Sequence, residues 1–197
     1  MKKFIVVLFT SLLALNAHAT LINIYESNSG LGSIAQAQSV IDNAIAANTT
    51  FNSDTILLSD TQAHRNQFDA SPIPGNHNAT FVLTATGTID TSLYAALKFH
   101  HDDGIDVKIG GNNLYTFNSN TPLRDSGWQY FADTGIESFD LLFWENIGEG
   151  SIFVHGLLRN GQTQEVANFS TAAVPEPTTI AVLGLGLLAL VSRRVKP

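Results

Sequence analysis

Between residues 79 and 158 the chain is a succession of short apolar segments separated by turn residues, and this rhythm limits the possible folds most strongly. In the segment ATFVLTATGTI, at 79–89, every second side chain is apolar or small, as in a strand with a buried face. Turn chemistry recurs about every ten residues, which predicts an antiparallel β-sandwich or jelly roll. Further strands are predicted at 92–99, 104–110, 113–117, 137–145 and 151–158.

One short helix is predicted before these strands. Ser33 followed by Gln36 has the form of a capping box, in which each side chain satisfies a free amide at the start of a helix. Apolar residues then recur at spacings of three and four until Asn48. We expect this helix to cover one face or end of the sandwich.

The first nineteen residues have the three parts of a secretory signal. Lys2 and Lys3 precede an apolar run from Phe4 to Leu15, and Ala17-His18-Ala19 is a small-x-small cleavage site. The sequence therefore predicts a signal peptide at 1–19 and a mature chain that begins near Thr20, outside the cytoplasm.

The last 24 residues, VPEPTTIAVLGLGLLALVSRRVKP, combine a Pro-flanked motif, an apolar run at 180–191 and a basic end. This order is typical of a membrane segment with a cytoplasmic anchor. Twelve apolar residues at about 1.5 Å each span only about 18 Å, whereas the hydrocarbon layer is roughly 30 Å thick. The predicted transmembrane helix is therefore short, and we expect the membrane to hold it only transiently. The residues concerned are Pro175, Glu176, Pro177, Arg193, Arg194 and Lys196.

This tail resembles the PEP-CTERM sorting signal of Gram-negative bacteria that make extracellular polysaccharide. The resemblance implies recognition, and cleavage near Pro175-Glu176-Pro177, by an exosortase, which is a membrane transpeptidase-like enzyme. It also implies transient insertion in the inner membrane, followed by delivery to the cell surface or extracellular matrix. The alternative is an ordinary C-terminal membrane anchor.

The segment between the two signals, 20–173, is long enough for one domain with a real core. From Thr20 to Val174 there are five Lys and Arg against sixteen Asp and Glu, a formal net charge of −11. Such an acidic domain is a poor partner for nucleic acid and is compatible with cation binding. The chain has no cysteine, so disulfides and thiol catalysis are excluded.

The stretch FHHDDGIDVKIGG, at 99–111, is the candidate functional site. Carboxylate oxygens suit calcium, whereas histidine nitrogens suit zinc and related metals. Neighbouring side chains on a strand point to opposite faces, so His100 and His101 cannot both face one ion. The same objection applies to Asp102 and Asp103 unless their peptide bond is unusual.

This stretch resembles the core motif of the protective-antigen-type (PA-fourteen) β-domain, the fold of the sugar-binding domains of fungal flocculins and epithelial adhesins. Residues 135–151, GIESFDLLFWENIGEGS, are similar to a later segment of that family. The resemblance implies a cis peptide between Asp102 and Asp103, both carboxylates turned to one calcium ion, and Asn146 as a third ligand. Sugar hydroxyls would bind the ion directly.

Two departures from that family pattern stand beside the resemblance. His100 and His101 occupy positions where many members have a small polar residue, and the loop at 146–150 is short, with Glu149 as a possible extra oxygen ligand. Without calcium, the aspartates would cap backbone amides at a hairpin tip and Asn146 would be a turn residue. Both alternatives are open at the level of the sequence.

Other polar and aromatic residues give weaker signals. No hydrolase, zinc-protease or phosphate-loop motif occurs, so a non-enzymatic protein is predicted, with a polysaccharide hydrolase as the less favoured alternative. Alternating aromatic residues indicate core, and Trp144 is the one predicted to contact a ligand. His64 and His77 are expected in solvated loops. The sequence therefore predicts a surface or biofilm-matrix protein that binds carbohydrate, namely exopolysaccharide, through calcium. The alternative is a purely structural matrix module.

Overall fold

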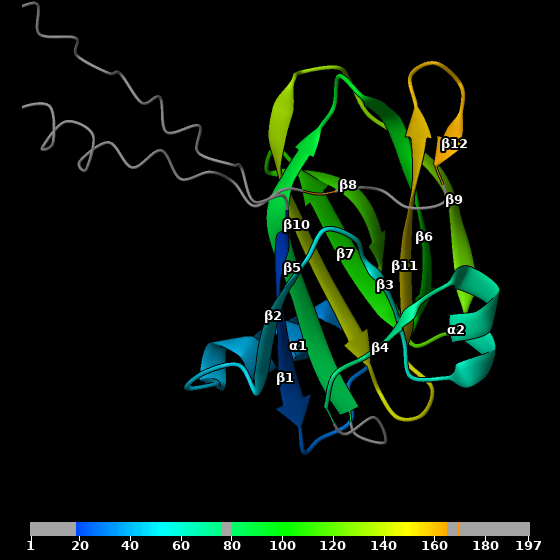
Figure 1. Cartoon of the computed structure of the whole chain (residues 1–197). Coiled ribbons are helices and arrows are strands. Elements are labelled where there is room, and N and C mark those ends of the chain that lie inside the picture. Colours follow the sequence, from blue (N-terminus) through cyan, green and yellow to red (C-terminus); the bar gives the residue numbers. More distant parts are fainter. Residues whose placement is uncertain (1–18, 76–79, 165–168, 170–197) are drawn as a thin grey trace, which may run out of the picture.

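The chain forms two β-sheets that face each other, as the computed structural model in Figure 1 shows. It describes residues 19–75, 80–164 and 169. The first sheet has the order β2-β1-β5-β10-β7-β8, and the second has the order β4-β3-β11-β6-β9, with β12 paired to β11. All pairs are antiparallel except β3 with β4. The predicted antiparallel sandwich is therefore confirmed, with one parallel pair at its edge.

The strand bounds are as follows. The first sheet contains β1 (Thr20–Ser27), β2 (Thr49–Ser53), β5 (Thr80–Asp90), β7 (Gly104–Ile109), β8 (Asn112–Phe117) and β10 (Ile136–Glu145). The second contains β3 (Leu57–Ser59), β4 (Ser71–Pro72), β6 (Tyr94–Asp102), β9 (Arg124–Tyr130), β11 (Ser151–Leu158) and β12 (Thr163–Gln164).

The main core lies between the two sheets and follows the alternation of the strands. On β10, Phe139, Leu141 and Phe143 face this core, whereas Trp144 packs in a second cluster on the other side of the sheet. That second cluster lies under α1 (Ile34–Asn43) and includes Leu31, Ala37 and Val82. Both faces of the first sheet are thus partly buried, one in the main core and the other under α1.

Two helices, not the one predicted, lie within the described residues. In α1, the Ser33 hydroxyl accepts from the amide of Gln36 at 3.3 Å, and the Gln36 side chain accepts from the amide of Gly32 at 2.8 Å. The helix ends at Asn43, five residues before the predicted end, because the chain turns there to begin β2 and Asn48 donates its amide to Ile24.

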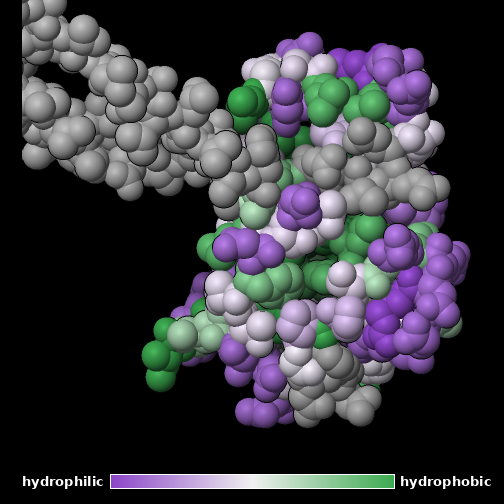
Figure 2. Space-filling view, viewed as in Figure 1, coloured by the Kyte–Doolittle hydropathy of each residue, from purple (hydrophilic) through white to green (hydrophobic). Residues whose placement is uncertain are grey.

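The second helix, α2 (Gln62–Phe68), covers part of the outer face of the second sheet. Thr61 caps it by accepting from the amide of His64 at 3.0 Å. Its sequence, QAHRNQF, has almost no apolar periodicity, and hydrophilic side chains gather over it in Figure 2. The prediction of a solvated loop around His64 was therefore wrong, because a threonine cap and one docked aromatic, Phe68, suffice to fix this helix on Phe153.

The predicted terminal segments lie outside the described residues. These are the signal peptide at 1–19, of which only Ala19 is described, and the sorting signal at 174–197 with its membrane helix. His77 is also outside them. Among the residues that the structure describes, no helix is long and apolar enough to cross a membrane.

Candidate metal centre

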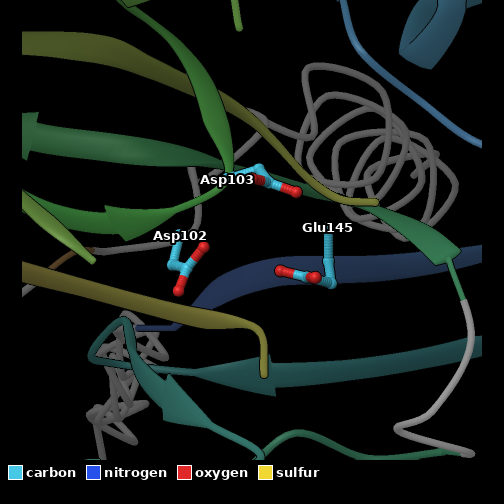
Figure 3. A group of neighbouring side chains, drawn as sticks. All are labelled: Asp102, Asp103 and Glu145. Atoms are coloured by element: carbon cyan, nitrogen blue, oxygen red, sulfur yellow. The ribbon is translucent and has the colours of Figure 1, made fainter. Parts of the chain in front are cut away.

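The candidate site lies where β6 passes into β7, at Asp102, Asp103 and Gly104. The peptide bond between Asp102 and Asp103 is cis, as the resemblance implied. Gly104 is required here, since a Cβ at this position would lie 1.9 Å from the ring of Trp144. Figure 3 shows the two aspartates and Glu145 with their carboxylates turned toward a common space.

Asp103 is a buried carboxylate that joins three segments of the chain. Its side chain is only 7 % exposed. One oxygen accepts from the amide of Thr121 at 2.7 Å, and the other accepts from the amide of Asn146 at 2.8 Å. Asp103 therefore does what the hairpin-tip alternative predicts, and its oxygens retain lone pairs that are free for a cation.

Asp102 is half-buried beside it and meets mostly negative neighbours. Burial, together with the charges of Asp103, Asp60 and Glu149, raises its pKa to about 7, although a hydrogen bond from the amide of Leu123 acts in the opposite direction. A carboxyl group in this position is therefore held partly protonated near neutral pH unless a cation is bound.

Glu145, at the end of β10, completes the group and is a residue that the sequence analysis did not assign to the site. One oxygen each of Asp102, Asp103 and Glu145 lies within 4.8 Å of the others. Glu145 is 2 % exposed, and burial together with the charges of Asp103 and Asp102 raises its pKa to about 8. Its Oε1 accepts from the amide of Ile147 at 3.1 Å, whereas Oε2 has no hydrogen-bond partner among the described residues.

The two histidines face opposite sides of β6, as strand geometry predicted. His101 is fully buried between the sheets, where Nδ1 lies 2.6 Å from the carbonyl oxygen of Asp103 and Nε2 lies 3.1 Å from the hydroxyl of Tyr115. Burial lowers its pKa to about 4. His100 is on the outer face, packed against Phe68 and His155. His101 thus supports the turn as a neutral ring and lies outside the carboxylate group.

The structure places the other predicted site residues as follows. The Asn146 side-chain oxygen accepts from the amide of Leu31 at 2.7 Å, and its backbone carbonyl accepts from the hydroxyl of Thr80. Glu149 is exposed in the loop that follows. Trp144 is 0 % exposed, and its Nε1 donates to Asn120 at 3.3 Å. Trp144 is therefore a core residue with no surface for a ligand, because its strand position turns it toward α1.

A signal for Glu145 was present in the sequence. On β10, residues 139, 141, 143 and 145 share one face, so Glu145 is a charged residue at a core-facing position. Asp60 gave no such signal, because it reaches the site only through the pairing of β3 with β11. Its amide donates to the carbonyl of Gly150 at 3.1 Å.

The group fits a hard divalent cation. Three carboxylate oxygens converge, and the buried Oε2 of Glu145 lacks a partner among the described residues. Carboxylate oxygens without sulfur or imidazole ligands are the donor set of calcium rather than of zinc. If calcium is bound, Asp102, Asp103 and Glu145 are the described side chains placed to hold it.

Comparison of the sequence with known families identifies one motif. The PEP-CTERM protein-sorting motif matches residues 173–195, which confirms the prediction made from the Pro-Glu-Pro motif, the apolar run and the basic end. A search of curated proteins finds no match to this chain.

Comparison with solved structures identifies the fold as that of PA14 domains. The PA14 domain of MpAFP antifreeze protein has a TM-score of 0.61 at 21 % identity, over 77 % of this chain and 89 % of that one. A PA14 sugar-binding domain from an RTX adhesin has a TM-score of 0.59 at 16 % identity, covering 78 % and 99 %. The A domain of epithelial adhesin 6 from Candida glabrata, in complex with Galb1-3GlcNAc, has a TM-score of 0.55 at 11 % identity, covering 81 % and 89 %.

These results place the protein in the class of PA14-fold β-sandwiches, and the predicted PA-fourteen resemblance is confirmed at the level of the fold. This particular chain joins that fold to a PEP-CTERM sorting motif at its C-terminal end.

Proposed function

We propose that this protein is exported, is sorted by an exosortase, and binds carbohydrate at the cell surface or in the extracellular matrix of a Gram-negative biofilm through a calcium ion at Asp102 and Asp103. In this proposal, residues 1–19 are the signal peptide, 20–173 the mature domain and 174–197 the sorting signal. The domain binds its glycan and catalyses no reaction.

The observation that carries the proposal is the convergence of three carboxylates where β6 passes into β7. One oxygen of each lies within 4.8 Å of the others, and Asp102 is less buried than Asp103 and Glu145. A calcium ion takes six to eight oxygen ligands. A surface ion held by a few carboxylates therefore keeps positions that sugar hydroxyls can fill.

Each described residue has a separate part in such a site. Asp102 and Asp103 supply carboxylate oxygens, and Asp103 also fixes the loop by accepting the amides of Thr121 and Asn146. His101 supports the turn from below through the carbonyl oxygen of Asp103. The resemblance gives Asn146 the role of third ligand. Glu149 belongs to the short loop in which this chain departs from the family pattern, and it would be an extra oxygen ligand.

Calcium titration followed by glycan binding tests the proposal. Isothermal titration of the full chain should give one calcium site, and the Asp102→Ala, Asp103→Ala double variant should lose it. A glycan array probed with calcium, and again with chelator, should show binding only when calcium is present. Unchanged calcium binding in the double variant would disprove the site, and a calcium-loaded protein that binds no glycan would disprove the carbohydrate function.

A second candidate function is a structural surface module without sugar binding. The observation that favours it is the pair of amide hydrogen bonds made by Asp103, because they stabilise the hairpin tip without any ion. The two candidates differ in the glycan array, since only the first predicts a calcium-dependent signal.

A further inference from the structure

Glu145 is absent from the ligand set that the resemblance implies, although its side chain lies in the same group as Asp102 and Asp103. We infer that Glu145, rather than the side chain of Asn146, is the third protein ligand of the cation, and that the excess negative charge of the completed site selects glycans without acidic groups. The inference rests on the proposed function and adds to it the ligand set and the class of sugar.

The state of the Glu145 carboxylate carries the first half. Glu145 is 2 % exposed, its Oε1 is taken by the amide of Ile147, and its Oε2 has no partner among the described residues. A buried carboxylate oxygen without a partner is costly, and the groups nearest to it in the site are two further carboxylates. A divalent cation between the three supplies the missing partner and removes their mutual repulsion.

Asn146 has a different job. Its side-chain oxygen accepts from the backbone amide of Leu31 at 2.7 Å, and its backbone amide donates to the carboxylate of Asp103 at 2.8 Å. Gly30 packs tightly against it, since a Cβ at Gly30 would lie 3.1 Å from the same oxygen. Asn146 is therefore a positioning residue, which joins the loop at 28–33 to the aspartate that binds the ion.

The charge of the site carries the second half. Three carboxylates and one divalent cation sum to −1. Asp60 lies beside the group, where its backbone amide donates a hydrogen bond to the carbonyl of Gly150, and Glu149 is exposed in the adjoining loop. The charges of both carboxylates act on Asp102. A uronate would bring another negative charge to this region and be repelled, whereas a neutral or amine-bearing sugar would not.

Terbium, which occupies calcium sites, tests the ligand assignment directly. Terbium luminescence of the full chain, excited through its tryptophans, should report binding, and displacement by calcium gives the calcium affinity. Glu145→Gln keeps an oxygen for the Ile147 amide and removes the charge, so it should fold and weaken calcium binding by at least about tenfold. Its luminescence lifetimes in light and heavy water should also show one more bound water than in the wild type.

Two variants serve as controls for this measurement. Glu137→Gln removes the same charge on the same strand but near Gly110, far from the group, and should leave affinity and water count unchanged. Asn146→Ala should keep the wild-type water count. Glu145→Gln with wild-type affinity and water count would overturn the ligand assignment, as would Asn146→Ala with an added water. A wild-type protein that binds neither terbium nor calcium would instead overturn the proposed function.

Sugar selectivity is tested with three matched ligands, galactose, galacturonate and galactosamine, each attached to the same surface. Calcium-loaded protein should bind the uronate at least about tenfold more weakly than the other two, and Asp60→Asn with Glu149→Gln should narrow this gap. Equal or tighter binding of the uronate would overturn the charge selection and leave calcium-dependent binding standing. Failure of all sugars on a broad glycan array would overturn the carbohydrate function itself.

Discussion

The space between the two sheets changes character from one end of the strands to the other. At one end, the ring centroids of Phe139 and Phe169 lie 4.2 Å apart, and both side chains are fully buried. At the other end, the same space holds His101, Asp103 and Glu145, which are almost as buried. One strand, β10, supplies residues to both regions, with Phe139 near its start and Glu145 at its end.

The difference separates residues that stabilise the fold from residues that are candidates for binding a ligand. A buried phenylalanine contributes about 2–3 kcal/mol to stability, whereas a buried carboxylate costs free energy unless it is paired. The apolar end needs no ligand to explain it. The charged end is explained only in part by its hydrogen bonds, because Glu145 Oε2 lacks a partner among the described residues and Asp102 lies next to other carboxylates.

The largest effect is expected at the apolar end. Phe139→Ala leaves a cavity beside Phe169 and should lower the free energy of unfolding by about 3–5 kcal/mol. Because the candidate cation site lies at the other end, the loss should be the same with calcium and with chelator. Urea denaturation in both conditions measures it.

The exposed ring of Tyr130 provides the control for that experiment. Tyr130 is 68 % exposed, so Tyr130→Ala should change the free energy of unfolding by less than about 1 kcal/mol. If Phe139→Ala lowered the free energy of unfolding in chelator but not in calcium, the two ends would not be independent.

Substitution of the two neighbouring aspartates should affect stability differently when no calcium is present. Asp103→Asn replaces an oxygen that accepts a backbone amide by a donor, so it should lower stability by about 1–3 kcal/mol. Asp102→Asn removes a charge that is repelled by its surroundings and should leave stability unchanged or raised. Thermal unfolding in chelator compares them. Equal losses in both variants would contradict the different roles given to the two carboxylates.

The sequence predicts the apolar end of this comparison better than the charged end. Strand alternation, turn residues and the capping box at Ser33 are local signals, and they gave the sandwich, most of its central strands and α1. The missed elements are β1 to β4, β9, β12 and α2. All of them except β1 are short or polar, and polar sequences such as RDSGWQY in β9 form strands because a sheet edge is available for pairing. In β1 the alternation of TLINIYES is a local signal that was not used.

The candidate site was predictable where its residues are adjacent in the chain. Asp102 and Asp103 are neighbours, and the family resemblance named them together with their cis peptide. Glu145 ends β10 and Asp60 directly follows β3, so their approach to the aspartates depends on sheet pairing that no local pattern specifies. Trp144 was predicted to contact a ligand because it is next to Glu145 and the loop at 146–150. The strand alternation that places it on the opposite face from Phe143 was already visible in the sequence.

Asn146→Ala should produce a smaller loss than Asp103→Asn. The variant keeps the backbone amide that binds Asp103 and removes only the bond to Leu31, so stability should fall by about 1 kcal/mol. Amide hydrogen exchange at Leu31 should rise in the same variant, because its donor loses its partner. An unchanged exchange rate would contradict the link between this loop and the charged end.

A small effect is expected from pH, and it arises at the charged end, where the carboxylates with raised pKa values lie. Asp102 and Glu145 have pKa values raised to about 7 and about 8, so the native state holds their protons more tightly than the unfolded state does, and stability falls as pH rises toward 8. His101, with its pKa lowered to about 4, acts oppositely, but only below the unfolded value of about 6.5. Burial also lowers the pKa of His100, which therefore acts in the same direction as His101. Between pH 6.5 and 8 we therefore expect the two carboxylates to dominate among the described residues with shifted pKa values. In chelator, Tm should fall by about 3 °C across this window, which is less than full burial would give because Asp102 is only half-buried.

Calcium and one variant serve as controls for this pH dependence. Saturating calcium, which holds the carboxylates ionised, should remove the fall in Tm, and Glu145→Gln should reduce it. A Tm that rises over the same window in chelator would show that these carboxylates are not the groups that titrate.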